Sequence, residues 1–300
     1  MTNMAKFRYY LAVLRIDHWH KNLFTLLGSL GAIAYFHVPL SRINGRAIFL
    51  GLLLSCFLSS VNYVINEFLD ASFDALHPVK KNRPIPSGRV NPEKLFFIAG
   101  LLLVVTLVAS ELWMPRKYTL FLILFFLSGI LYNLRPVRAK DVAFLDVVVE
   151  SLNNPIRLCL GWYVFPFANR FPPVSLIICF WAFGAYLMTA KRYAELEKIT
   201  KHQAEMYRPV YRVYTSRSLL AMMHVYALAT LLTFAWIAAL HKSALLYFLP
   251  IAIVFFVWFY NLTTKEDSFV ANPEKIYVNK PFLIFCLASL GVLMILGIFF

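Results

Sequence analysis

Charged residues are scarce in this sequence, and acidic residues are about half as common as basic ones. Charged side chains make up 15% of the 300 residues, with 15 Asp and Glu against 29 Lys and Arg, while hydrophobic residues make up 60%. A soluble domain typically has about 25% charged and about 45–50% apolar residues. The composition therefore excludes an ordinary soluble domain and predicts that most of the chain lies in a membrane.

The signatures of several enzyme classes are also absent. The chain has no Gly-rich phosphate loop, no GxSxG motif and no HExxH motif. Its four cysteines all fall in apolar runs without the spacing of a metal site, and its seven histidines are scattered. The sequence therefore gives little support to nucleotide-loop, serine-hydrolase or zinc-peptidase chemistry.

Long hydrophobic runs, in contrast, recur along the whole chain. A transmembrane helix needs roughly 20 apolar residues. Nine runs approach this length, at residues 23–40, 46–66, 94–112, 118–134, 142–165, 173–190, 218–240, 244–262 and 281–300. We predict an all-α, polytopic membrane protein with nine transmembrane helices, which form a single domain over residues 1–300.

The distribution of basic residues predicts the orientation of these helices. Cytoplasmic loops of membrane proteins carry an excess of Lys and Arg. With the N-terminus in the cytoplasm, most basic residues fall on the cytoplasmic side. The outer side then holds only Arg42, Arg46, Arg116, Lys117, Arg170 and Lys242. We predict an integral protein of the bacterial inner membrane with a cytoplasmic N-terminus, cytoplasmic active-site loops and an external C-terminus. This bias accounts for the net charge of +14 without nucleic acid as a partner.

Three oxygen-bearing side chains lie four residues apart where the second run ends. On a continuing helix, Asn66, Asp70 and Asp74 share one face. A divalent cation would offset the repulsion between the two carboxylates. Oxygen ligands of this kind suit Mg²⁺, which binds through carboxylates and substrate phosphates. The alternative is a solvated helix end.

A basic, Pro-rich loop follows this acidic row. Lys80, Lys81 and Arg83 come directly after His77 and Pro78, which end the helix. Arg grips phosphate oxygens in pairs, and Lys acts as a mobile point charge. We interpret the loop as part of a diphosphate site, although the same cations could be ordinary membrane anchors.

A second row of polar side chains lies within the fifth run. Asp146, Glu150 and Asn154 are four residues apart, and Arg157 returns near the same face. Ionisable groups inside a membrane span are costly and are functional candidates by default. A cavity shared with the first row is the favoured interpretation, and an internal ion pair is the alternative.

Two further groups flank predicted spans. Lys191, Arg192, Tyr193 and Glu195 follow the sixth span, and Lys21 precedes the first. Lys21 could bind phosphate or simply flank the membrane. Beyond the sixth span, aromatic and basic residues alternate, which is common at membrane interfaces. We interpret this segment as interfacial, and it contains Tyr207, Arg208, Tyr211, Arg212, Tyr214 and Arg217.

Together these motifs resemble the UbiA superfamily of intramembrane transferases. Many members carry NDxxDxxxD, and this chain has Asn66-Glu67-x-x-Asp70-x-x-x-Asp74; the second family motif, DxxxD, resembles Asp146 and Glu150. The resemblance implies nine helices around a central cavity, with Mg²⁺ and a diphosphate bound there. The metal ligands it implies are Asn66, Asp70, Asp74, Asp146 and Glu150.

One branch of the superfamily, the decaprenyl-phosphate phosphoribosyltransferases, is similar in further elements. These are Trp19-x-Lys21-Asn22 before the first span, Arg157, and the run from Lys191 to Leu196. The implied donor is phosphoribosyl pyrophosphate, and the implied acceptor is a polyprenyl phosphate. The implied catalytic residues are Asp70, Asp74, Asp146 and Lys191. The implied substrate-binding residues are Lys21, Lys80, Lys81, Arg83, Tyr132, Lys140, Arg157, Arg192, Tyr193 and Glu195.

Three alternatives stay open at this stage. Within the same class, the donor could be a prenyl diphosphate, with transfer to an aromatic or other acceptor as in quinone and haem biosynthesis. A transporter or lipid scramblase should carry charges towards both faces, but Glu111 is the only acidic residue assigned to the outer side. A lipid-binding scaffold would not need two rows of acidic residues.

Overall fold

The computed structural model describes residues 3–75, 80–198, 205–206, 208–241, 243–265, 269–271 and 273–299. Within these ranges the regular structure is helical, and there is no β-strand. The α-helices are α1 (Asn3–Leu14), α2 (Phe24–Tyr35), α3 (Gly45–Asp74), α4 (Pro92–Trp113), α5 (Arg116–Asn133), α6 (Leu145–Ser151), α7 (Asn153–Trp162), α8 (Val174–Lys198), α10 (Ser216–His241), α11 (Leu249–Thr263) and α12 (Lys280–Phe299). The 3₁₀ segments used below are η1 (Ile16–Leu23), η3 (Lys80–Asn82), η4 (Ala139–Asp141), η5 (Pro209–Arg212) and η6 (Ser243–Phe248).

Apart from α1, which precedes the first run, the α-helices correspond to the nine predicted apolar runs. In the described part of the chain, α6 and α7 share the fifth run, η6 and α11 share the eighth, and each other run is one helix. Six of these helical stretches are long and apolar enough to cross a membrane by length and composition alone: α3, α4, α8, α10, η6 with α11, and α12. The prediction of an all-α fold with nine such units is confirmed.

The fifth run is not the single continuous helix that the sequence predicted. α6 ends at Ser151 and α7 begins at Asn153. Pro155 lies in the first turn of α7, where it has no N–H to donate and its ring would clash with the carbonyl of Ser151 in an unbroken helix. The indole of Trp181 donates a hydrogen bond to the Val148 carbonyl at 3.2 Å, next to this break. Because α7 is a separate helix, its side chains do not continue the faces of α6.

The two largest apolar cores of the described bundle lie one in each half of the chain. The first is built from α2, α3, α5 and α7 and includes Leu58, Leu122 and Trp162. The second is built from α8, α10, α11 and α12 and includes Met223 and Phe282. α10 packs along α8 in the second half.

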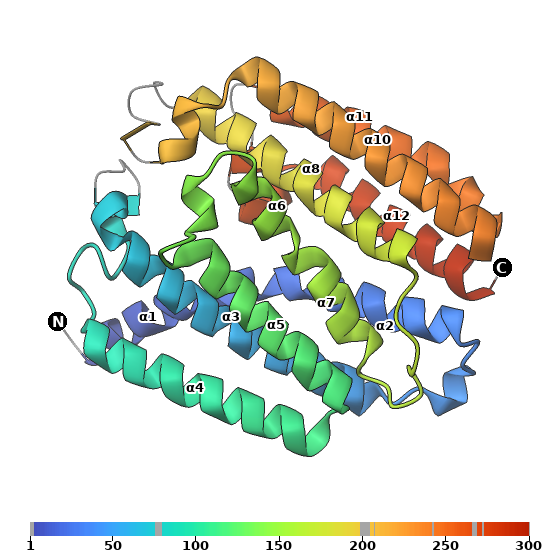
Figure 1. Cartoon of the computed structure of the whole chain (residues 1–300), viewed down its shortest axis with the longest axis horizontal. Coiled ribbons are helices and arrows are strands. Elements are labelled where there is room, and N and C mark those ends of the chain that lie inside the picture. Colours follow the sequence, from blue (N-terminus) through green and yellow to red (C-terminus); the bar gives the residue numbers. More distant parts are fainter. Residues whose placement is uncertain are drawn as a thin grey trace.

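The ends of several helices gather at one end of the bundle (Figure 1). α3, α5 and α8 finish there, and α6 and α10 begin there, on the left in the view. We call this the site end. α1 also lies at this end, whereas α12 finishes at the other. A chain that starts at one end of a bundle and finishes at the other crosses it an odd number of times, which agrees with the nine predicted helices.

α2 and α7 approach unusually closely through two glycines. A Cβ atom added to Gly28 would lie 1.9 Å from the Leu158 carbonyl oxygen, and one added to Gly161 would lie 1.7 Å from the Thr25 carbonyl oxygen. Ser29 also donates a hydrogen bond to the Gly161 carbonyl at 3.0 Å. Small residues allow such backbone proximity between membrane helices. The contact fixes the start of α2 beside α7.

Candidate functional site

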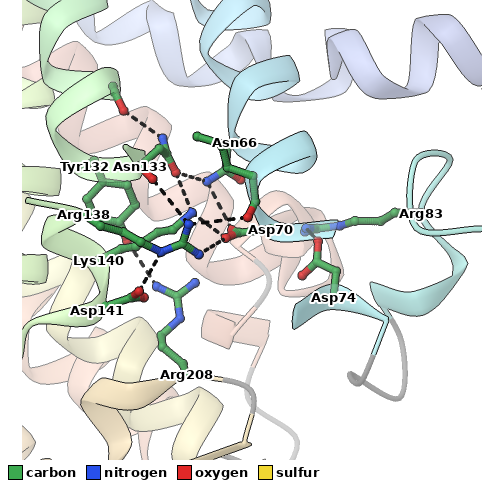
Figure 2. Close-up of polar contacts among 12 residues, drawn as sticks. Asn66, Asp70, Asp74, Arg83, Tyr132, Asn133, Arg138, Lys140, Asp141 and Arg208 are labelled. Atoms are coloured by element: carbon green, nitrogen blue, oxygen red, sulfur yellow. Dashed lines mark hydrogen bonds and ion pairs between the residues drawn. The ribbon is translucent and has the colours of Figure 1, made fainter. Parts of the chain in front are cut away.

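Asp70 is the centre of the first polar cluster, at the site end of α3 (Figure 2). One of its carboxylate oxygens accepts hydrogen bonds from Lys140 at 2.5 Å and from Arg138 at 3.0 Å. Both cations come from the segment between α5 and α6, about 70 residues along the chain. Lys140 is 2% exposed. Its burial lowers its pKa to about 8, although the Asp70 carboxylate opposes this shift.

A pocket opens beside Asp70. It is lined by Asp70, Phe73, Arg138, Lys140, Asp141 and Arg208. Arg138 bridges its two carboxylates, because its Nε donates to Asp141 at 2.6 Å while its other arm reaches Asp70. The Arg138 guanidinium also lies over the Phe73 ring, 5.0 Å from its centroid. Three cations and two carboxylates therefore face one small volume.

Two asparagines connect this pocket to the helices. Asn66 donates to the Asn133 side-chain oxygen at 2.5 Å and to Asp70 at 3.4 Å. The same Asn133 oxygen accepts a hydrogen bond from Lys140 at 2.8 Å. α3, α5 and η4 are thereby joined through a single side-chain oxygen (Figure 2).

Asp74, one turn further along α3, does not line the pocket. Its buried carboxylate accepts a hydrogen bond from Arg83 at 2.5 Å. The basic loop after α3 is therefore held by this ion pair, and Figure 2 shows the Asp74–Arg83 pair apart from the Asp70 group. Lys81 is exposed, and the side chain of Lys80 lies outside the described residues.

Glu67 holds the other side of the same loop. It is 1% exposed. One carboxylate oxygen accepts the Ile85 backbone N–H at 3.2 Å, and the other lies 3.6 Å from an Arg15 nitrogen. The residue that replaces Asp in the family motif is thus tied to the loop and to the N-terminal segment.

We expect Glu67→Gln to loosen the loop between α3 and α4. The amide keeps an acceptor for the Ile85 N–H but loses the charge beside Arg15. Since hydrogen bonds to charged groups are worth about 1.5–3 kcal/mol, the Ile85 amide should exchange about tenfold faster or more. Hydrogen–deuterium exchange measures this, with exposed Glu93→Gln as the matched control. Unchanged exchange at Ile85 would remove Glu67 from this role.

Asp146 lies in a second, fully buried network. It is 0% exposed. It accepts hydrogen bonds from Arg192 at 2.8 Å and from the Tyr214 hydroxyl at 2.6 Å. Burial and the nearby Asp146 charge raise the pKa of Tyr214, so its hydroxyl keeps the proton that it donates. Both Asp146 oxygens are thus engaged by protein groups.

Arg192 extends this network to the pocket. It donates to Glu195 at 2.8 Å and to the Tyr132 hydroxyl at 3.0 Å. Arg208, which lines the pocket, donates to the same hydroxyl at 3.3 Å. Tyr211 donates to Glu195 at 2.6 Å. The two clusters therefore form one connected polar system that joins the two halves of the bundle.

The interfacial interpretation of the segment after α8 was wrong for two tyrosines. Tyr211 is 0% exposed and Tyr214 is 1% exposed. They pack with Val210 and Leu219 in a small core that Tyr193 also contacts. Their hydroxyls bind carboxylates inside the protein: Tyr211 donates to Glu195 on α8, and Tyr214 donates to Asp146 on α6. Tyr207 lies outside the described residues.

Four of the predicted residues lie elsewhere. Glu150 accepts a hydrogen bond from Asn153 at 3.3 Å. Arg157 donates from its Nε to Asn22 at 3.0 Å, and Lys21 lies 3.4 Å from a His18 ring nitrogen. Lys191 is partly buried on α8. The helix break after α6 separates Glu150 from Asn154, so the second polar row is not continuous.

The pocket offers a donor set that fits Mg²⁺ in part. Asp70 and Asp141 both face it, and the Asn66 amide lies against Asp70. Mg²⁺ in proteins commonly uses one or two carboxylates and completes its shell with water and substrate phosphates. Among the described residues, no group of three His, Cys, Asp or Glu side chains is placed to hold a metal. The five ligands expected from the sequence therefore stay a prediction; of these five, Asp70 lines the pocket and Asn66 lies beside Asp70.

Sequence reasoning did not place four residues in the site: Asn133, Arg138 and Asp141, which had no predicted role, and Arg208, which was interpreted as interfacial. Three of them occur in one short polar segment, 133–141, between two apolar runs. That segment is unusually rich in charge for a short connection, which is the one signal that the sequence offered. Arg208 had none, because its basic and aromatic neighbours are also typical of an interface.

This geometry agrees with comparisons to known proteins. Residues 22–297 match the UbiA prenyltransferase family, and the chain belongs to that family. A decaprenyl-phosphate phosphoribosyltransferase of Mycolicibacterium smegmatis is 28% identical over 69% of this chain and 62% of its own length. A protoheme IX farnesyltransferase 2 of Pseudoalteromonas atlantica is 34% identical over 40% of this chain and 39% of its own length. The chain thus matches about three fifths, or less, of these relatives.

Among solved structures, a UbiA homolog from Archaeoglobus fulgidus bound to DMAPP and Mg²⁺ has the same fold. The TM-score is 0.70, with 15% identity over 97% of this chain and 99% of the other. At this identity the likeness concerns the fold alone. It agrees with the arrangement of helices described above.

Proposed function

We propose that this protein is a Mg²⁺-dependent intramembrane transferase that moves phosphoribose from phosphoribosyl pyrophosphate to a polyprenyl phosphate. The observation that carries the proposal is the pocket where Arg138, Lys140 and Arg208 face Asp70 and Asp141. Three cations converging at the end of a membrane bundle suit a diphosphate group. The phosphoribosyltransferase relatives, with matches over more than half of this chain, favour this donor.

The donor diphosphate would bind through the three cations of the pocket. Arg138 and Lys140 now contact Asp70, so a diphosphate must share or replace those contacts. Asp70 and Asp141, with Asn66 beside them, would hold Mg²⁺ when it is bound. The metal would neutralise charge that develops on the leaving diphosphate. Lys80, Lys81, Arg83, Lys191 and Arg192 remain predicted contributors to the positive field around the donor.

The transfer exchanges one C–O bond for another. The bond between ribose C1 and the diphosphate oxygen breaks, and the diphosphate leaves with the electron pair. A phosphate oxygen of the acceptor forms the new bond to C1. The phosphate is already ionised at neutral pH, so no strong general base is required. Cations held in place before the reaction stabilise the departing charge without reorganisation.

Prenyl transfer from a prenyl diphosphate is the second candidate. A farnesyltransferase relative and a fold neighbour bound to DMAPP favour it. The same cations would bind the same diphosphate group, so the pocket alone does not separate the two donors. Glu195, which accepts hydrogen bonds from Arg192 and Tyr211, is the proposed ribose ligand that a prenyl chain would not need.

Purified protein with radiolabelled donor tests the proposal. One reaction contains phosphoribosyl pyrophosphate, a polyprenyl phosphate and Mg²⁺, and a parallel reaction contains a prenyl diphosphate with aromatic acceptors. We expect a labelled transfer product, separated from the labelled donor by chromatography, in the first reaction alone. Product only in the second reaction would replace phosphoribosyl transfer with prenyl transfer.

We propose that the site end faces the cytoplasm. Asn82 in η3 is exposed at this end, whereas Arg116 is exposed where α5 begins at the opposite end. In a variant without the native cysteines, Asn82→Cys should resist a membrane-impermeant thiol reagent in intact cells, and Arg116→Cys should react. Reaction at position 82 with protection at position 116 would reverse the orientation.

A further inference from the structure

A second group of cations lies around η1, the segment that precedes α2. We call it the η1 cluster, and it consists of Lys21 from η1, Arg157 from α7 and Lys191 from α8. The Lys21 ammonium lies 3.4 Å from a ring nitrogen of His18, and that ring packs edge-on against Tyr63. Burial and the charges of Lys21, Arg15 and Lys191 lower the pKa of His18 to about 3. Cations from separate elements therefore act on one site.

Arg157 is fixed in this cluster by only one of its nitrogens. Its Nε donates to the Asn22 oxygen, which also accepts a hydrogen bond from Ser59 at 3.0 Å. Its guanidinium lies over the Phe125 ring, 4.8 Å from the centroid. Among the described residues its two terminal nitrogens have no hydrogen-bond partner, and these nitrogens are not fully buried. The Arg157 guanidinium is therefore held in place through its Nε, and its terminal N–H groups can donate to a ligand.

The η1 cluster differs in charge from the Asp70 pocket. At the pocket, Asp70 and Asp141 each contact a cation within 3.0 Å. In the described part of the chain, neither Arg157 nor Lys191 lies within 4.0 Å of a carboxylate oxygen. Glu150 is the acidic side chain that acts on Arg157, and Glu195 acts on Lys191. Asp17, near His18, is largely exposed.

We propose that the η1 cluster binds the phosphate monoester headgroup of the lipid acceptor, so that donor and acceptor phosphates occupy separate basic subsites. This inference rests on the proposed function and deepens it. An Arg fork that is bonded to Asn22, together with lysine ammonium groups that act on His18 in the same 3₁₀ segment, suits a phosphate dianion. Ile16 and Leu23 are exposed apolar residues on η1, on either side of Lys21, where a lipid tail can lie.

Two subsites have a consequence for the class of acceptor. When both substrates are bound, the donor diphosphate pairs with the cations of the Asp70 pocket, and the acceptor phosphate pairs with those of the η1 cluster. A neutral aromatic acceptor would bring no phosphate oxygens to the Arg157 guanidinium, so the contacts that this cluster offers would go unused. The η1 cluster therefore favours phosphate-bearing acceptors.

Binding of matched lipids to the full-length protein in phosphatidylcholine nanodiscs tests this subsite. The probes are a long-chain polyprenyl phosphate and the polyprenol that lacks the phosphate. Wild type should bind the phosphate about tenfold or more tightly, because charge-assisted hydrogen bonds are lost with the alcohol. Lys21→Gln and Arg157→Gln should each remove most of this preference. Lys94→Gln, which changes an exposed lysine at the start of α4, should retain it.

Two further measurements separate the possible failures. Binding of phosphoribosyl pyrophosphate, followed by equilibrium dialysis, should change less than twofold in Lys21→Gln and fall about tenfold or more in Arg138→Gln. If wild type binds the two lipids equally, or binds inorganic phosphate as tightly as the phosphorylated lipid, the subsite is overturned while the donor pocket stands. If the phosphate preference is present but phosphoribose is not transferred, the proposed function fails and the subsite stands. Because Arg157 also bonds Asn22 and packs over Phe125, Lys21→Gln decides the matter if Arg157→Gln does not fold.

Discussion

Asp70→Asn is expected to lower transfer activity by about 10²–10³-fold or more, the scale of losing one preorganised electrostatic contact to a transition state. The substitution keeps the shape of the side chain and removes the charge that Arg138 and Lys140 now contact. It also removes a carboxylate that faces the pocket. The rate should be measured against Mg²⁺ concentration, and wild type should lose activity in excess EDTA and regain it with Mg²⁺.

Asp74→Asn is the matched control, one helical turn away on the same face. The sequence predicted that both carboxylates bind the metal, whereas Asp74 contacts Arg83 outside the pocket. We therefore expect Asp74→Asn to leave the Mg²⁺ concentration for half-maximal activity unchanged, whatever its effect on rate. A raised Mg²⁺ requirement would return Asp74 to the metal site. Full activity of wild type in EDTA would remove the metal from the mechanism.

Asp146→Ala is expected to lower the free energy of unfolding by about 3–5 kcal/mol, the usual effect of removing one partner of a buried ion pair. Asp146 is fully buried, and Arg192 would keep only Glu195 as an anionic contact. Tyr214 would also lose its acceptor. Reversible unfolding in mixed micelles, followed by circular dichroism, measures the change.

Tyr214→Phe provides the comparison, because it removes one hydrogen bond and no charge. The expected loss is about 1–3 kcal/mol, as a buried oxygen of Asp146 loses a donor. A double variant that also carries Arg192→Gln should be less destabilised than the sum of the single variants, since the paired groups interact directly. If Asp146→Ala unfolds like wild type and instead raises the Mg²⁺ requirement, then Asp146 is a metal ligand and not the anchor of Arg192.

The sequence was most informative where neighbours along one helix decide the outcome. The spacing of Asn66, Asp70 and Asp74 predicted a shared face on α3, and the three do follow one continuous helix. The apolar runs predicted the helices because roughly 20 apolar residues in a row have few other stable uses. Both inferences depend on local geometry, which the sequence contains directly.

The partners of those side chains could not be predicted in the same way. Asp70 meets Arg138 across 68 positions of sequence, and Asp146 meets Arg192 across 46. Such contacts depend on how helices pack, and a pattern of single residues does not encode a pair. Asp146 and Asp70 looked alike as acidic residues at the edge of apolar runs. The packing of the helices buries Asp146 fully and leaves Asp70 at a pocket.

One local signal was present but was not used. Pro155 lies well inside the predicted run 142–165, where its ring is incompatible with an unbroken helix unless a new turn begins. Together with Asn153 and Asn154, it marks the start of α7. Recognising that break would have placed Glu150 and Arg157 on separate helices and removed the continuous polar row.

The close contact between α2 and α7 also has a consequence for the order in which the protein is made. α2 alone has 12 residues, about 18 Å of helix at 1.5 Å per residue, so it matches a hydrocarbon layer of about 30 Å only together with η1, which precedes it. Its partner glycine on α7 is synthesised 132 positions after Ser29. The ribosome therefore releases α2 well before the surface that receives it exists. α2 can pack against α7 only after α7 has been synthesised. The polar groups around Asn22 and Arg157 are assembled only at that stage.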